Sequence, residues 1–270
     1  MDYQNTLILT INNKEKTIPI IIKNILKNTS RYTIKIIIVL DGCNDKTEIN
    51  LKKIFEKVNS RFLIDFIYTS DIWETKANNA ALKLVKTPFA TLVQDDMLIK
   101  EKDWDKTMID RYLVSNIFSL SGRAAHDFSI RSGKFTVNNF IGREYPLGNL
   151  NFFGKVVGKI FSIFKLYWIY SYLKIFNKRL CANRGPLLLK MDLVKELNYF
   201  DEEFAPFELD DIDLSCRAFK KFGLYSGCLP IYYVELGGSK KNNSFSKKVS
   251  QKSIIKNTKI IEKRHKDLYE

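Results

Sequence analysis

Apolar runs alternate with amphipathic patterns along the first hundred residues. The clearest run, 34–40, is a continuous series of β-branched and aliphatic residues, which is typical of a strand buried in a parallel sheet. Similar runs predict strands at 6–11, 62–68 and 89–93, and patterns of helical period predict helices at 17–28, from Asp45 onward and at 74–85. Strand–helix alternation of this kind predicts an α/β fold with a mostly parallel sheet and right-handed crossovers.

The regular pattern fades after about Leu120. Residues 122–150 show little periodicity, and a long segment of this kind is usually functional or mobile. Periodicity returns at 208–222, a predicted helix that begins with acidic residues. Residues 239–270 form a lysine-rich tail, with a helix expected from about Val249.

Residues 155–176 are strongly apolar and aromatic. Four lysines interrupt the run, so a membrane-spanning helix is not favoured. Three alternatives remain for this segment: it is a helix buried beneath an acceptor site, an oligomer contact, or a helix that lies in a membrane interface.

Length and composition set the domain organisation. The chain has 270 residues, of which 45% are hydrophobic, enough for one sizeable core. We expect one domain at 1–238, with halves at 1–100 and 101–238, followed by a basic helical tail at 239–270.

The formal net charge is +14. It fits either an anionic partner, such as a nucleotide or an acidic membrane surface, or a simple compositional bias. The four cysteines form no CxxC pair, which favours reduced thiols and a cytoplasmic location. The N-terminus reaches its first predicted strand at once, so we expect no signal peptide.

Four acidic clusters follow apolar runs. Asp41 follows the second predicted strand, Asp95 and Asp96 follow the fourth, and Glu235 follows PIYYV. A further cluster lies in FELDDIDLSCR. Carboxylates just beyond buried strands lie where an open α/β sheet keeps its ligand crevice, and the arrangement suits a metal-bound diphosphate.

Four segments resemble the motifs of family 2 glycosyltransferases with the GT-A fold. They are LILTINNKEKTIPIIIKNILKNT, VLDGCNDKT, KANNAALKLVKTPFATLVQDD and LVKELNYFDEEFAPFELDDIDLSCRAFKKFG. Each motif alone is weak, but four in this order and spacing are specific, and the resemblance covers roughly 5–235. It implies a Rossmann-like, mostly parallel central sheet flanked by helices.

The resemblance also assigns residues to a nucleotide-sugar site. Asp41 would contact the nucleotide base and Thr10 would lie beside it, although a turn aspartate and a strand-end hydroxyl are plain alternatives. Lys76 could face phosphate, Asn79 would brace the nucleotide side, and Arg184 would lie near the donor sugar or the acceptor.

The metal site is implied by the same comparison. Asp96 would ligate Mn²⁺ or Mg²⁺, since both prefer oxygen ligands, and Asp95 would contact the ribose or share the metal. Gln94 stands where many relatives carry an acid. Glu235 stands where many relatives carry a histidine, and it could replace that ligand or be an ordinary surface residue.

The last motif holds the implied general base. Asp211 is the first choice and Asp210 the next, with helix capping as the alternative for both. Asp213 and Arg217 are four residues apart and are predicted to form a structural pair.

Together these features predict a metal-dependent, hexosyltransferase-like enzyme. It would move a sugar from a nucleotide-diphosphate sugar, UDP-linked by expectation, to a glycan or lipid-linked acceptor with inversion, in surface polysaccharide synthesis. It would be cytoplasmic, with peripheral contact at the inner membrane face through 155–176 and the tail.

Two other classes of protein are alternatives to this enzyme. A catalytically inactive GT-A-fold protein that binds a membrane surface or another polyanion stays open, and it would bind no nucleotide in a metal-dependent way. A nucleotidyltransferase would need a glycine-rich basic loop near the N-terminus, which TINNKEKT does not supply. No nucleic-acid partner is expected, because the basic residues do not interleave with aromatic ones.

Overall fold

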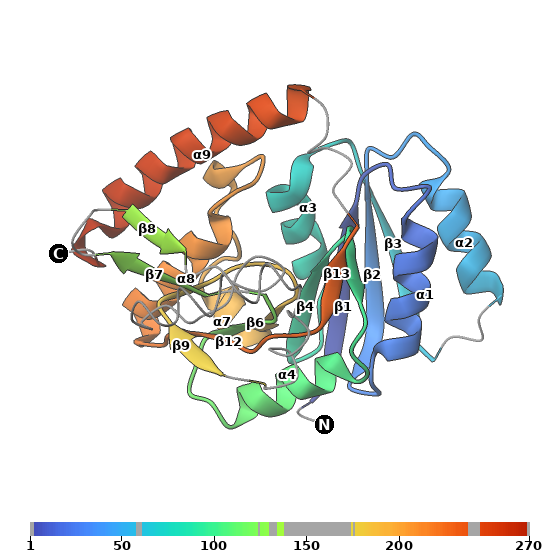
Figure 1. The fold of residues 1–270 in the computed structure, drawn as a ribbon, viewed down its shortest axis with the longest axis horizontal. Helices are drawn as coiled ribbons and strands as arrows, with labels where there is room; N and C mark the ends of the chain where they lie inside the picture. The colour runs from blue at the N-terminus through green and yellow to red at the C-terminus, as the bar shows by residue number, and fades with distance from the viewer. Residues whose placement is uncertain are drawn as a thin grey trace, which may run out of the picture.

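A computed structural model of the chain describes residues 3–57, 61–123, 125–129, 134–137, 174, 176–236 and 244–268. In this part of the chain the largest sheet has eight strands in the order β3-β2-β1-β4-β11-β6-β12-β9 (Figure 1). Its parallel half consists of β1 (Asn5–Ile11), β2 (Thr33–Asp41), β3 (Leu63–Thr69) and β4 (Phe89–Gln94). The four predicted strands are confirmed to within a residue or two.

Strand register brings the carboxyl ends of the central strands together. Thr10, near the end of β1, lies opposite Val39 of β2 on one side and Gln94 of β4 on the other. Asp41, the last residue of β2, and Asp95, the residue after β4, therefore lie at one edge of the sheet.

Helices cover both faces of the parallel half (Figure 1). Side chains of a strand point alternately to opposite faces, so Leu7 and Leu9 pack in one core and Ile8 in the other. The first core includes α1 (Ile18–Asn28), α2 (Thr47–Lys57) and α4 (Trp104–Leu113). The second includes α3 (Trp73–Leu82), α7 (Met191–Glu196) and α8 (Asp210–Phe222).

The rest of the described sheet structure is mixed. Strand β11 (Leu187–Lys190) runs antiparallel to β4 and to β6 (Ser119–Ser121). The other strands of the large sheet are β12 (Ser226–Cys228) and β9 (Asn177–Arg179). The smaller sheets consist of β10 (Cys181–Ala182) with β7 (Ala125–Ser129) and β8 (Lys134–Val137), and of β5 (Met97–Ile99) with β13 (Tyr233–Glu235).

The tail contains a long helix that is docked on the domain. Helix α9 (Ser244–His265) begins at Ser244 rather than near Val249, and η4 (Lys266–Leu268) follows it. Ile261 of α9 is fully buried in a core cluster with Ile212 and Cys216 of α8. Packing against α8 therefore stabilises a helix whose own sequence is mostly polar.

No helix in the described parts of the chain is long and apolar enough to cross a membrane. The predicted apolar segment 155–176, apart from Lys174 and Phe176, lies outside the described residues.

Candidate functional site

Asp41 closes strand β2 and holds the turn that leads into α3. It is 1% exposed, and its carboxylate accepts hydrogen bonds from Thr69 Oγ1 at 2.8 Å, from the Ile72 backbone N–H at 2.8 Å and from the Trp73 backbone N–H at 2.9 Å. Three donors leave one lone pair of Oδ2 for another partner. That lone pair is available to a nucleotide base. In the structure, the Asp41 carboxylate stabilises the turn between β3 and α3.

The β1–α1 loop joins the ends of three strands. Thr10 Oγ1 donates to Asn78 Oδ1 of α3 at 2.7 Å. Asn12 donates through its side chain to the Asp41 carbonyl at 2.5 Å and through its backbone N–H to Asp95 Oδ2 at 3.4 Å. The predicted nucleotide contacts Thr10 and Asp41 thus lie in one hydrogen-bonded loop region with Asp95.

Asp95 has a basic partner that the sequence reasoning missed. Lys14 Nζ lies 3.2 Å from Asp95 Oδ1, and its side chain is 3% exposed. Burial raises the pKa of Asp95 to about 6, with Asp96 adding to the effect and Lys14 opposing it. The sequence signal that could have indicated this partner is the position of Lys14, in the turn after the first strand.

Asp96 has fewer side-chain partners than Asp95 among the described residues. It makes no hydrogen bond or ion pair through its side chain with any residue that the structure describes, while its carbonyl accepts from the Leu236 N–H at 2.8 Å. The β5–β13 pairing places Glu235 opposite Met97, so Glu235 lies beside Asp96 in the fold.

The Glu235 carboxylate is held by an arginine. Arg123 Nη2 lies 2.9 Å from Glu235 Oε1, and Arg123 Nη1 donates to Gln94 Oε1 at 3.1 Å. The carboxylate of Glu235, which the sequence resemblance suggested as a metal ligand, forms this ion pair in the structure. Its role as a ligand stays a prediction.

The donor atoms of this edge fit a hard divalent ion. Within the described residues, no group of three or more His, Cys, Asp or Glu side chains is arranged to hold a metal. Mg²⁺ and similar ions in nucleotide sites need only one or two carboxylates, because phosphate and water oxygens complete the shell. Asp96, with Asp95 next to it, supplies that minimal set.

Helix α8 begins with two carboxylates that have different surroundings. Asp210 is fully buried and accepts from Thr75 Oγ1 at 2.7 Å, and its other oxygen accepts from the Arg184 guanidinium. Acidic neighbours overcome the effect of burial and raise the pKa of Arg184. This pair joins α3, α8 and the turn before β11, so Asp210 is held inside the structure.

Asp211 is 5% exposed and is held by backbone donors. Its Oδ2 accepts from the Arg184 N–H at 2.8 Å and its Oδ1 from the Ile212 N–H at 2.9 Å. Burial raises the pKa of Asp211 to about 7, with Asp210 adding to the rise and Arg184 opposing it. A carboxylate with a pKa near neutrality is well matched to accept a proton.

Glu74 interacts with both groups of aspartates, those after β4 and those at the start of α8. Glu74 was not identified from the sequence. It lies in the first turn of α3, its side chain is 33% exposed, and Oε1 is 3.5 Å from Arg184 Nη1. Burial raises its pKa, Arg184 opposes this, and Asp210 and Asp96 are close enough to add to the rise. The carboxylates after β4 and those at the start of α8 therefore lie near one another.

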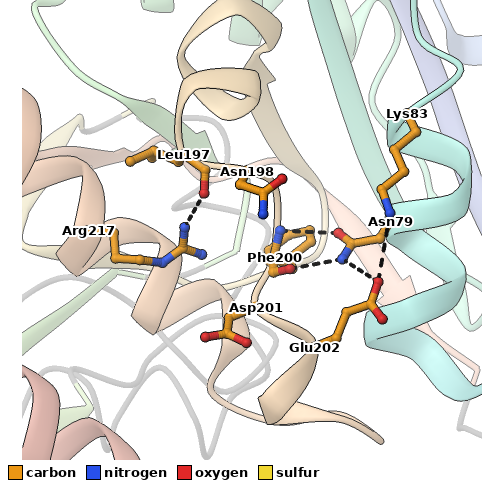
Figure 2. A pocket seen from close by; sticks show the side chains of 8 residues that line it. All are labelled: Asn79, Lys83, Leu197, Asn198, Phe200, Asp201, Glu202 and Arg217. Atoms are coloured by element: carbon orange, nitrogen blue, oxygen red, sulfur yellow. Dashed lines mark hydrogen bonds and ion pairs between the residues drawn. The ribbon is translucent and has the colours of Figure 1, made fainter.

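Lys76 and Asn79 occupy other parts of α3. Lys76 is exposed, whereas Asn79 is buried and exchanges two hydrogen bonds with the backbone of Phe200, at 2.8 and 3.1 Å. Asn79 also lines a polar hollow of about 370 Å³ with Arg217 and Glu202 (Figure 2). Asn79 thus braces the chain before α8, and its nucleotide role stays a prediction.

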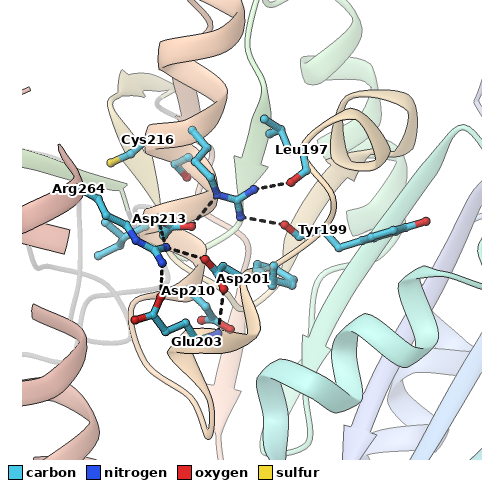
Figure 3. Close-up of polar contacts among 12 residues, drawn as sticks. Leu197, Tyr199, Asp201, Glu203, Asp210, Asp213, Cys216 and Arg264 are labelled. Atoms are coloured by element: carbon cyan, nitrogen blue, oxygen red, sulfur yellow. Dashed lines mark hydrogen bonds and ion pairs between the residues drawn. The ribbon is translucent and has the colours of Figure 1, made fainter. Parts of the chain in front are cut away.

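The predicted pair of Asp213 and Arg217 is confirmed, with Arg217 Nε 2.6 Å from Asp213 Oδ2. His265 Nε2 lies 2.9 Å from Asp213 Oδ1, and Arg264 reaches both Asp213 and Asp201 (Figure 3). Burial would raise the pKa of Asp213, but its bonds to His265 and Arg217 hold that pKa below the ordinary value. Asp213 is a structural group.

The sequence profile described as Glycosyl transferase family 2 matches residues 6–152. No curated protein matches the chain at a significant level.

Solved structures share the fold. The chain is similar to GalNAc-T7 with UDP, GalNAc and Mn²⁺ (TM-score 0.61, 11% identity, covering 86% of this chain and 44% of that one). It is similar to the mannosyltransferase PcManGT from Pyrobaculum calidifontis in complex with GDP-Man and Mn²⁺ (0.56, 14%, 87% and 57%). It is also similar to residues 1–349 of S. aureus TarS (0.52, 16%, 86% and 60%).

The chain spans between 44% and 60% of the length of these three structures. At such identities the likeness shows the fold alone, and it confirms the GT-A type of α/β fold that the motifs predicted.

Proposed function

This chain belongs to glycosyl transferase family 2, and we propose that it transfers a sugar from a nucleotide-diphosphate sugar to an acceptor hydroxyl with inversion. One observation carries the proposal. The carboxylates of Asp96 and Asp211 come from opposite halves of the domain and are linked through Glu74 and Arg184. Asp96 acts on Glu74 electrostatically, Glu74 lies 3.5 Å from the Arg184 guanidinium, and the Arg184 backbone N–H donates to the near-neutral carboxylate of Asp211.

The donor would lie along the ends of β1, β2 and β4. Asp41 and Thr10 would contact the nucleoside, and Asp95 and Asp96 would contact the ribose and the diphosphate. A divalent ion held by Asp96, Mn²⁺ or Mg²⁺, would neutralise charge on the leaving diphosphate. Two of the solved structures of this fold contain Mn²⁺, which supports the assignment.

Asp211 would act on the acceptor. Its carboxylate takes the proton of the acceptor hydroxyl while the acceptor oxygen forms a bond to the anomeric carbon. The bond from that carbon to the diphosphate breaks, and the electron pair leaves with the nucleoside diphosphate. Attack from the face opposite the leaving group inverts the anomeric configuration, as in inverting glycosidases.

Arg184 and Asp210 would position this base. The Arg184 N–H fixes one oxygen of Asp211, and the Arg184 guanidinium is itself fixed by Asp210 and Glu74. We assign Asp210 to positioning rather than to proton transfer, because its side chain is fully buried and forms an ion pair with the Arg184 guanidinium.

We propose a UDP-linked donor and a glycan or lipid-linked acceptor in surface polysaccharide synthesis. Related folds bind UDP in one case and GDP-Man in another, so the test must include both bases.

We also propose a cytoplasmic location with peripheral contact at an anionic membrane. The outward face of α9 carries exposed lysines that make no hydrogen bond or ion pair within the described residues. They are Lys248, Lys252, Lys259 and Lys263. Ile255, 61% exposed, lies on the same face. Basic side chains around an apolar one are typical of a helix that lies on an anionic lipid surface.

The test is a panel of UDP- and GDP-sugars incubated with the protein, with and without Mn²⁺, and assayed for released nucleoside diphosphate. The proposal expects Mn²⁺-dependent release from at least one sugar. Salt-sensitive binding of polyanions without any release from the panel would favour the inactive binding protein instead.

A further inference from the structure

The turn that leads into α8 has an unusual backbone. Glu208 and Leu209, the two residues before Asp210, both have positive φ, at 80° and 65°. Side chains other than glycine disfavour this region, so the turn persists only where its surroundings hold it. Because Asp210 and Asp211 follow at once, this turn sets where both carboxylates lie.

Helix α9 supplies a buried amide to that turn. The Asn257 side chain is fully buried, and its Nδ2 donates to the carbonyls of Phe204 at 2.9 Å, Phe207 at 3.1 Å and Glu208 at 2.8 Å. With two N–H groups facing three carbonyls, one contact is shared. Asn257 Oδ1 has no partner among the described residues, so the donors alone orient the side chain.

Other contacts join α9 to the same stretch of chain. Ser250 Oγ donates to Glu208 Oε1 at 3.0 Å, and Lys256 Nζ contacts the Glu203 carbonyl. At the far end of α9, His265 Nε2 lies 2.9 Å from Asp213 Oδ1 in the first turn of α8. The helix therefore binds the chain on both sides of Asp211.

We propose that α9 is a positioning element of the active site and that Asn257 is its central positioning residue. Asn257 holds the strained turn so that α8 presents Asp211 to the acceptor. Donor binding depends on the other edge, at the ends of β1, β2 and β4, and should not need Asn257. This inference rests on the proposed transferase function for its kinetic part alone.

The test compares Asn257→Leu with Gln251→Leu. Both replace an amide by an apolar side chain on α9, but the Gln251 side chain is exposed and makes no hydrogen bond with any residue that the structure describes. Hydrogen exchange of 204–213 and steady-state kinetics with the donor and Mn²⁺ are measured on both variants and on the unmodified protein.

In Asn257→Leu, exchange of 204–213 should rise about tenfold or more, because the turn opens locally, while exchange of 33–41 stays unchanged. The kcat should fall about tenfold to a hundredfold, since a small misplacement of a reacting group costs that much. The KM for the donor should change less than about threefold. Gln251→Leu should match the unmodified protein.

Ser250→Ala is the milder variant if Asn257→Leu does not fold, and it should shift both readouts in the same direction. Unchanged exchange in 204–213, or a loss of kcat matched by an equal loss of donor affinity, would overturn the proposal. If the unmodified protein releases no nucleoside diphosphate, the transferase function is refuted. Hydrogen exchange of 204–213 then decides by itself whether α9 holds the turn.

Discussion

Asp210 and Asp211 are adjacent in sequence, and the structure predicts opposite results when each is replaced by asparagine. Asp210 is fully buried and pairs with Arg184, whereas Asp211 is held by two backbone N–H groups. We predict that Asp210→Asn lowers stability and that Asp211→Asn lowers turnover.

The stability loss can be estimated from the ion pair. Removing one partner of a buried pair costs about 3–5 kcal/mol, because the other charge is left uncompensated. Arg184 keeps Glu74 at 3.5 Å and Asp211 at 4.0 Å, so the lower end, about 3 kcal/mol, applies to Asp210→Asn. At 2–4 °C per kcal/mol, Tm should fall by about 6–12 °C.

The turnover loss follows from the role of Asp211. An asparagine keeps the shape of the side chain but cannot take a proton, and general-base catalysis contributes about 10²–10⁴-fold to rate. One backbone N–H loses its acceptor, at about 1–3 kcal/mol, and the relief of repulsion from Asp210 offsets part of that cost. Asp211→Asn should therefore remain folded.

Calorimetric Tm and release of nucleoside diphosphate from the donor are the two readouts. Asp65→Asn is the control, because Asp65 forms a surface pair with Lys35 and is 49% exposed, and such pairs contribute little. Near-normal turnover in Asp211→Asn would refute the reasoning. An Asp210→Asn protein with the same Tm as the unmodified protein would also refute it.

Three further predictions follow from the same site. Because the pKa of Asp211 is raised to about 7, its carboxylate is protonated at lower pH. A pH–rate profile should therefore show kcat falling about tenfold for each pH unit below pH 7. A kcat that does not change between pH 7 and pH 5 would contradict this. Asp41→Asn should loosen the turn at 69–73, since Asp41 accepts two backbone N–H bonds there. Nucleotide affinity and Tm should both fall, and an unchanged Tm would count against that role. Replacing Lys248, Lys252, Lys259 and Lys263 of α9 by glutamine should abolish sedimentation with phosphatidylserine vesicles, whereas the unmodified protein should bind the vesicles in low salt only. Equal binding by both proteins would show that α9 is not the contact.

The sequence predicted well what depends on local pattern. The continuous run at 34–40 predicted β2 because a strand buried on both faces must be apolar throughout. The i, i+4 spacing of Asp213 and Arg217 likewise predicted their ion pair, since that spacing puts both on one side of a helix.

What the sequence could not show are contacts between distant segments. Lys14 meets Asp95 only because β1 and β4 are neighbours in the sheet, and Thr75 meets Asp210 across 135 positions. For the two aspartates at the start of α8, the sequence predicted an order of preference but no partners. Their different partners in the structure, the Arg184 guanidinium for Asp210 and two backbone N–H groups for Asp211, support the separate roles that we propose for them.

Docking of the tail helix α9 also depends on contacts between segments that are distant in the sequence. The lysine-rich pattern of α9 did not indicate that this helix docks on the domain, because the buried side of the helix is mostly polar. Among the α9 side chains that the structure describes, Ile261 is the one apolar residue that is fully buried. Asn257 and His265 become understandable once the turn before α8 and Asp213 are placed beside them.

Calorimetric titration of UDP, with and without Mn²⁺, tests the central claim most directly when the unmodified protein is compared with Asp96→Asn. The account predicts binding that is strengthened by Mn²⁺ in the unmodified protein and loses that dependence in Asp96→Asn, whose fold is unchanged. Equal Mn²⁺-dependent binding by both proteins would contradict it.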